Sequence, residues 1–158
     1  MIRHIILAFS GFLAGVGAGI IMGVLSDIAY RIGFFKSSLF AVDGNFVIKA
    51  TGMKSDTKLV YLTGIPVHLL TSGVFGAIYV LVTSIAALPT LSAALAALYV
   101  SFLWLSMLFI ALPMAGQGIL GSKAGRNTWF EQLLLHILFL GVYYKILHVT
   151  YGAAQSIM

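Results

Sequence analysis

The feature that most constrains this chain is an apolar run over residues 5–25 that contains no charged side chain. About 20 apolar residues are what an α-helix needs to cross the hydrocarbon core of a bilayer. A secretory signal peptide also carries an apolar run, but that run spans only about 7–15 residues and leads to a small-residue cleavage site. Because this run is longer and no such site follows it, we expect a retained transmembrane helix.

Three further apolar runs follow, and the last two are separated by a Gly-rich loop. Of all residues 61% are apolar and only 8% are charged, whereas soluble domains average about 25% charged residues. We therefore predict an all-α, polytopic membrane protein. It would be a four-transmembrane-helix bundle forming one domain over residues 1–158, with spans at about residues 5–27, 60–88, 90–112 and 129–149.

The long polar loop, about residues 31–59, separates the first two spans. Inside it, Asp43-Gly44 stands between two short β-prone runs, "LFAV" and "NFVIK". An Asp-Gly pair in that setting is a hairpin signal, so a small hairpin at the membrane surface is expected there. At the end of the first span, Asp27 and Arg31 have the spacing of a helical ion pair.

The basic residues indicate an orientation. The loops at residues 31–59 and 113–128 together hold seven of the nine Lys and Arg residues: Arg31, Lys36, Lys49, Lys54, Lys58, Lys123 and Arg126. Because cytoplasmic loops of membrane proteins are enriched in Lys and Arg, we predict that both loops are cytoplasmic and both termini outside. The net charge of +5 is thus attributed to topology and lipid headgroups, and no nucleic-acid partner is expected.

The most regular motif consists of four glycines spaced four residues apart: Gly11, Gly15, Gly19 and Gly23. This spacing places them nearly on one face of a helix. Helices approach closely over such faces, as in GxxxG pairs and glycine zippers. The face could be a subunit interface or a cofactor slot. Packing against this protein's own helices is the simpler interpretation, because a four-helix bundle needs such surfaces.

Two histidines lie at similar positions in two of the predicted spans. "HLLTSGVFG" begins at His68 and "HILFLGVYY" begins at His136. Two imidazoles at matched depth could ligate a metal ion or a haem, or transfer protons. The alternative is a structural hydrogen bond between helices, with Ser72, Tyr79 or Tyr143 as the partner.

Glu131 is the one carboxylate well inside a predicted span boundary, which makes it a candidate proton site. Thr128 followed by Glu131 also matches a capping box, so we expect Glu131 to cap the start of the last helix. Cysteine is absent, which excludes disulfides and thiolate chemistry. No P-loop, dinucleotide fingerprint, HExxH motif or nucleophile elbow occurs, and no catalytic set supports an enzyme.

Three segments resemble the YagU-type family of small bacterial inner-membrane proteins: "VHLLTSGVFGAIYVLV", "ALPMAGQGIL" and "WFEQLLLHILFLGVYY". Together they cover about half of the chain, and the family-like positions are His68, Pro113, Trp129, Glu131 and His136. The resemblance implies a bacterial inner membrane and brings no settled activity. It also suggests cytoplasmic termini, in conflict with the count of basic residues, which we follow.

Three functions agree with these features. The first is a non-catalytic accessory subunit that packs on or assembles a larger membrane complex, with lipids, other subunits or a second copy as partners. The second is an electron-transfer subunit that holds haem or a metal with His68 and His136. The third is a small channel or transporter, which the shortage of polar residues within the spans disfavours. In the first case no cofactor is expected.

Overall fold

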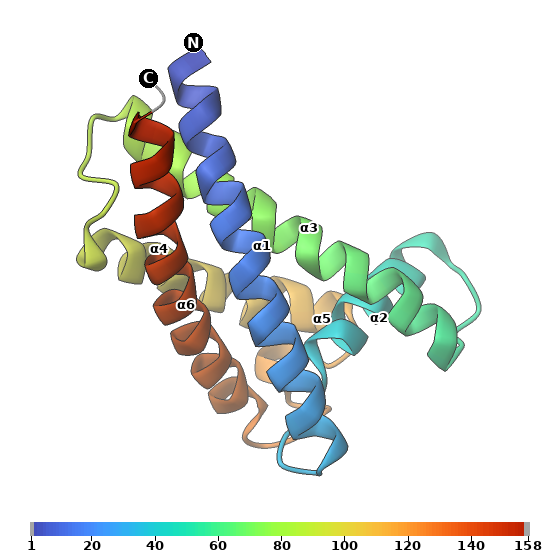
Figure 1. The fold of residues 1–158 in the computed structure, drawn as a ribbon. Helices are drawn as coiled ribbons and strands as arrows, with labels where there is room; N and C mark the ends of the chain where they lie inside the picture. The colour runs from blue at the N-terminus through green and yellow to red at the C-terminus, as the bar shows by residue number, and fades with distance from the viewer. Residues whose placement is uncertain (1, 157–158) are drawn as a thin grey trace.

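The computed structural model describes residues 2–156, and this part of the chain is helical, with no strand (Figure 1). The elements are α1 (Ile2–Arg31), α2 (Leu39–Thr51), α3 (Thr57–Ile85), α4 (Ala93–Ser106), the π-helix η1 (Met107–Ala111), α5 (Leu112–Met114), the 3-10 helix η2 (Ile119–Gly121) and α6 (Thr128–Ser156). The predicted all-α class is confirmed.

Four helical segments are long and apolar enough to cross a membrane: Ile2–Arg31, Thr57–Ile85, Ala93–Met114 and Thr128–Ser156. Each corresponds to one predicted span, with boundaries within four residues except at the end of the last helix, which continues to Ser156. Many large apolar side chains on these helices are exposed, for example Leu62, Leu98 and Ile137. Exposed apolar side chains spread over long helices are expected where lipid is the solvent. These properties are those of an integral membrane protein.

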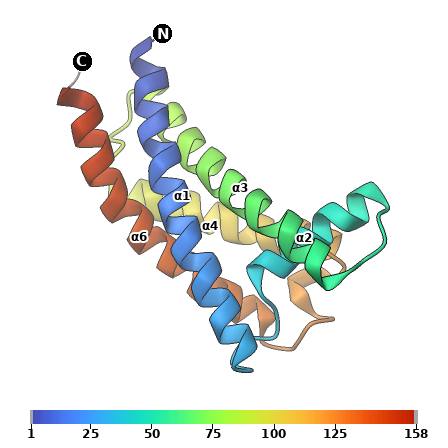
Figure 2. The same ribbon diagram turned by 45° about the vertical axis from the view of Figure 1, so that its right-hand side comes forward.

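Helix α1 lies between α3 and α6 in two views of the molecule (Figures 1 and 2). The core between these helices contains small residues of α1, such as Ala14 and Ala18, and aromatic residues of α3 and α6, such as Tyr79 and Tyr143. The Tyr143 hydroxyl donates a hydrogen bond to the Gly76 carbonyl across the bundle (2.9 Å). α4 packs against α6 and completes the bundle.

The predicted hairpin around Asp43-Gly44 is wrong, because these residues lie inside the helix α2. Tertiary packing outweighs the local turn preference here. A Cβ on Gly44 would overlap the Val60 carbonyl of α3, and a Cβ on Gly64 would overlap the Phe40 carbonyl of α2. These two glycines therefore allow the backbones of α2 and α3 into direct contact, which fixes α2 along the first half of α3.

Candidate functional site

The four glycines of α1 face other helices of the same chain. A Cβ on Gly11 would overlap the Gly76 carbonyl, and one on Gly15 would overlap the Ser72 carbonyl. On Gly19 it would come within 2.6 Å of the Ser72 side chain. On Gly23 it would meet Phe40 of α2 and lie 3.1 Å from Cδ2 of His68. The glycine face is thus occupied by α2 and α3, which leaves no room on it for a second chain.

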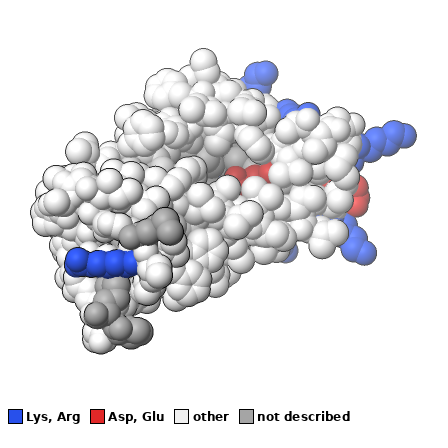
Figure 3. Space-filling model, turned by 90° about the horizontal axis from the view of Figure 1, so that it is seen from above, with Lys and Arg blue, Asp and Glu red and all other residues white. Residues whose placement is uncertain are grey.

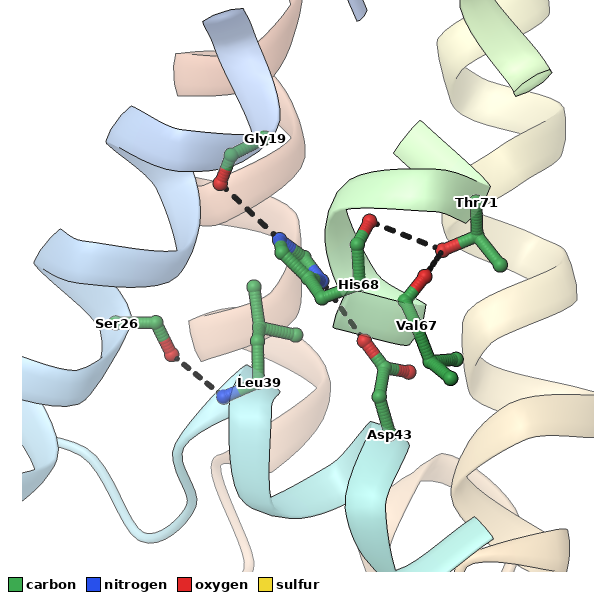
Figure 4. Close-up of polar contacts among 7 residues, drawn as sticks. All are labelled: Gly19, Ser26, Leu39, Asp43, Val67, His68 and Thr71. Carbon is green, nitrogen blue, oxygen red and sulfur yellow. Dashed lines mark hydrogen bonds and ion pairs between the residues drawn. The ribbon is translucent and has the colours of Figure 1, made fainter. Parts of the chain in front are cut away.

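This close approach brings His68 of α3 between α1 and α2 (Figure 4). The imidazole is buried, and its Nδ1 lies 2.8 Å from Oδ2 of Asp43 on α2. Its Nε2 lies 3.2 Å from the carbonyl oxygen of Gly19 on α1. His68 therefore links three helices through hydrogen bonds. The partners expected from the sequence (Ser72, Tyr79 or Tyr143) do not bond to it.

The hydrogen bonds of His68 determine where its protons lie. The Gly19 carbonyl can only accept, so Nε2 carries a proton. One further proton is then shared between Nδ1 and the Asp43 carboxyl group. Whether it sits on the ring or on the carboxyl, the His68–Asp43 pair has no net charge. Neutrality lowers the cost of burying two ionisable groups at this depth in an apolar bundle.

His136 of α6 lies on the same cavity as His68 but makes no hydrogen bond with it. Its Nδ1 donates to the carbonyl of Gln132, one turn earlier in the same helix (2.8 Å). The proton of the neutral imidazole is therefore on Nδ1, which leaves the Nε2 lone pair free to accept a hydrogen bond. The predicted tyrosine partner does not pair with His136, because Tyr143 donates to Gly76 instead.

The cavity that the two histidines share has a volume of about 380 Å³ and mostly apolar walls. Besides His68, His136 and Asp43 it is lined by side chains of five helices, among them Met22, Leu39, Phe46, Phe75, Leu103, Met107 and Phe139. The π-helix η1 contributes Met107, Ile110 and Ala111. Single π-helical turns inside α-helices are often found at functional sites.

The mouth of this cavity lies between α3 and the α4–η1 segment. Thr71 and Phe75 on one side and Ile110 on the other line the cavity and are exposed at the surface. Seen from above, the molecule has a hollow with acidic oxygen-bearing side-chain surface at its floor (Figure 3). Most of the Lys and Arg side chains visible in this view lie toward the end of the molecule where α2 and the start of α3 lie. Thr71 stands in the middle of the 29-residue helix α3, so the mouth is at the depth of the membrane core.

Glu131 does not form the predicted capping box. Its Oε2 accepts a hydrogen bond from the backbone N–H of Lys36, in the loop after α1 (3.0 Å). The hydroxyl of Thr128 is buried and has no hydrogen-bond partner. The first turn of α6 bonds instead to the carbonyl of Asn127. Glu131 thus connects the loop after α1 to the start of α6, a long-range contact that a local capping motif cannot reveal.

The hydrogen bonds of the two histidines test whether His68 and His136 could together ligate a metal ion or a haem. Both ring nitrogens of His68 already have partners, so ligation would require breaking at least one of these bonds. Within residues 2–156, no three His, Asp or Glu side chains converge as a metal-binding group. Of the ring nitrogens of the two histidines, only Nε2 of His136 has no hydrogen-bond partner. The residues present therefore do not form a two-histidine axial pair as they stand.

Asp43 is the residue of this candidate site that was expected from the sequence to lie in a turn. The signal that could have revealed it is an acid within the apolar stretch "LFAVDGNFVI". Such an acid is usually paired, and the buried histidines are its natural partners. No protein family model, curated protein or solved structure matches this chain. The resemblance to the YagU-type family stays a prediction.

Proposed function

We propose that this protein is an integral membrane binding protein, and that the cavity holding His68, Asp43 and His136 takes up an uncharged, hydroxyl-bearing lipophilic molecule. The proposal rests on the free Nε2 lone pair of His136 and on the mostly apolar lining of a cavity that opens at membrane depth. Small-molecule sites are typically apolar pockets in which a few polar groups fix the orientation of the ligand.

The polar groups on the cavity favour ligands that donate hydrogen bonds. Nε2 of His136 can only accept in the neutral tautomer, and the second carboxyl oxygen of Asp43 is a further acceptor. An anionic headgroup would find no free imidazole N–H group to bind it, because those of His68 and His136 already have acceptors within this chain, which disfavours fatty acids and phosphates. A hydroxyl group donates one hydrogen bond and so satisfies one of these acceptors, and a hydroquinone carries a second hydroxyl group. Alcohols and hydroquinones are therefore the expected class.

The walls and the mouth explain why the ligand should be lipophilic. Aromatic and aliphatic side chains, such as Phe46, Phe75 and Phe139, surround the polar end of the cavity. A ligand that enters beside Thr71 and Ile110 comes from the membrane, because both residues lie well inside candidate spans. A molecule dissolved in lipid therefore has direct access, and its hydroxyl group gains hydrogen bonds that lipid tails do not offer.

The accessory-subunit role predicted from the sequence is a second candidate that keeps its support from small size and short loops. It loses its strongest argument, because α2 and α3 of this chain fill the glycine face. A bacterial inner-membrane location and cytoplasmic loops at residues 31–59 and 113–128 also stay proposals.

The test is ligand-induced stabilisation of the purified protein. Decylhydroquinone at 100 times its Kd should raise the free energy of unfolding by about 2.7 kcal/mol. Its dimethyl ether, which has the same ring and tail but no donor, should have little effect. His136→Phe should abolish the stabilisation, and His148→Phe, an exposed histidine three turns along α6, should retain it. Equal stabilisation by the dimethyl ether would refute the proposal.

A further inference from the structure

A second cavity lies where α1 ends and α6 begins. It has a volume of about 530 Å³ and is lined by Phe34, Lys36, Arg126, Asn127 and Glu131. Figures 1 and 2 place the end of α1 and the start of α6 side by side at the end of the bundle away from the termini. Both are ends of candidate membrane spans, so this cavity lies at the level of the lipid headgroups.

Glu131 is the unusual group in this cavity. It is only 6% exposed, and its one hydrogen bond comes from the Lys36 amide. The ion pairs found in residues 2–156 are Arg31–Asp27 and His68–Asp43, so no Lys, Arg or His nitrogen lies within 4.0 Å of the Glu131 carboxylate. Burying a carboxylate without a counter-charge is costly. A buried carboxylate that lines a cavity and has no counter-charge favours a cationic ligand there.

Two cations line the outer part of the same cavity. Lys36 and Arg126 are exposed, and neither side chain forms an ion pair within the described part of the chain. Guanidinium and ammonium groups are the usual protein partners of phosphate. The cavity therefore presents a buried negative charge and, nearer to water, two positive charges.

We propose that this cavity binds the headgroup of a phospholipid with a primary ammonium, as in phosphatidylethanolamine. Its ammonium group would lie on the Glu131 carboxylate, and its phosphate would lie between Lys36 and Arg126. A primary ammonium can donate hydrogen bonds to the carboxylate, whereas the quaternary ammonium of choline has no N–H group. A purely anionic headgroup gains the two cations but leaves Glu131 unpaired. This site is separate from the His68 cavity, so either proposal can fail without the other.

The experiment measures the binding of short-chain lipids to the full-length protein in detergent, using the fluorescence of its tryptophans. Dihexanoyl phosphatidylethanolamine should bind about fivefold more tightly than the choline and glycerol analogues, as expected of one additional ion pair. Free phosphoethanolamine, which has the headgroup without acyl chains, should bind more weakly than the lipid. If free phosphoethanolamine binds as tightly as the lipid, the ligand is a soluble headgroup compound and the assignment to a membrane lipid is wrong.

Glu131→Gln should bring the ethanolamine and choline lipids to equal affinity, because it keeps an oxygen for the Lys36 amide and removes the charge. Arg126→Gln should weaken both lipids several-fold without changing their ratio. The matched control is Lys54→Gln, which removes one exposed positive charge outside the cavity and should change neither affinity. A preference for the glycerol lipid in the unmodified protein, or an unchanged ratio in Glu131→Gln, would overturn the assignment. If Glu131→Gln does not fold, the preference of the unmodified protein among the ethanolamine, choline and glycerol lipids still tests the proposal.

Discussion

The backbone of Gly15 in α1 lies directly against the backbone of Ser72 in α3. A Cβ on Gly15 would overlap the Ser72 carbonyl oxygen and come within 3.1 Å of the Cα of Gly73. Within a membrane, helices associate through close packing rather than through the hydrophobic effect, so such backbone contacts carry much of the association energy. This crossing also fixes the distance between α1 and His68, one turn before Ser72.

Gly15→Ala should therefore destabilise the protein. The new methyl group meets backbone atoms that cannot rotate away, and α1 and α3 must separate. Overpacking of this kind costs about 1–3 kcal/mol, more than the roughly 0.5–1 kcal/mol that Ala gains over Gly in a helix. Thermal unfolding in detergent, followed by circular dichroism, measures the change.

Gly141→Ala is the matched control for this prediction. Gly141 lies inside α6 and has no atom within 4 Å of the position that a Cβ would take. Alanine should be neutral or slightly stabilising there, through its higher helix propensity. Equal destabilisation by both substitutions would show that the α1–α3 crossing is not a special contact.

The membrane spans could be predicted from the sequence because their cause is local. A run of about 20 apolar residues must form a helix in a bilayer whatever its neighbours do. α2 could not be predicted in this way. Its 13 residues are too few to span, and Asp43-Gly44 prefers a turn on its own. The close contact between the two helices at Gly44 of α2 and Gly64 of α3 favours the helix, and this contact is not local.

We expect Gly44→Ala to release α2 from α3, since its methyl group would overlap the Val60 carbonyl. The chain has no cysteine, so a single Val42→Cys substitution reports on α2 alone. Val42 is fully buried, and the thiol should react slowly with a maleimide. Adding Gly44→Ala should accelerate labelling at least about tenfold, which corresponds to a loss of about 1.4 kcal/mol in docking. Adding Asn45→Ala, which only shortens a side chain at the neighbouring position, should leave the rate unchanged.

The candidate site was predictable only in part. His68 and His136 stand out in the sequence as polar residues inside apolar runs, and they do line one cavity. Their partners were not predictable, because the contact with Asp43 depends on α2 being a helix docked on α3. The partner of Glu131 was not predictable for a similar reason, since Lys36 lies in a loop 95 positions away.

The His68–Asp43 bond should appear as a coupling energy. Asp43→Ala and His68→Ala each remove one partner of a largely buried pair, so each should destabilise the protein. The loss in free energy of unfolding of the double variant should be smaller than the sum of the two single losses by about 1–2 kcal/mol. The reason is that the second substitution removes a group that is already unpaired. As a control, the losses in free energy of unfolding caused by Asp43→Ala and Thr83→Ala should be additive. Thr83 lies near the other end of α3, where its hydroxyl group is hydrogen-bonded to that of Thr90. A coupling near zero for His68 and Asp43 would mean that their contact contributes nothing to stability.

The orientation in the membrane gives the last prediction. The hydrogen bond from the Lys36 amide to Glu131 joins the loop after α1 to the start of α6 at one end of the bundle, and the start of α1 and the end of α6 lie at the other end (Figure 1). The count of Lys and Arg places the two basic loops in the cytoplasm, whereas the family resemblance implies cytoplasmic termini. Lys54→Cys and Lys123→Cys should therefore be labelled by an impermeant maleimide only in inside-out vesicles, and Gly152→Cys only in intact cells. Gly152 is exposed and contacts nothing at its Cβ position, so its substitution alters neither packing nor the charge count. The reverse pattern at all three positions would show that the family's orientation holds and that the basic loops face outward.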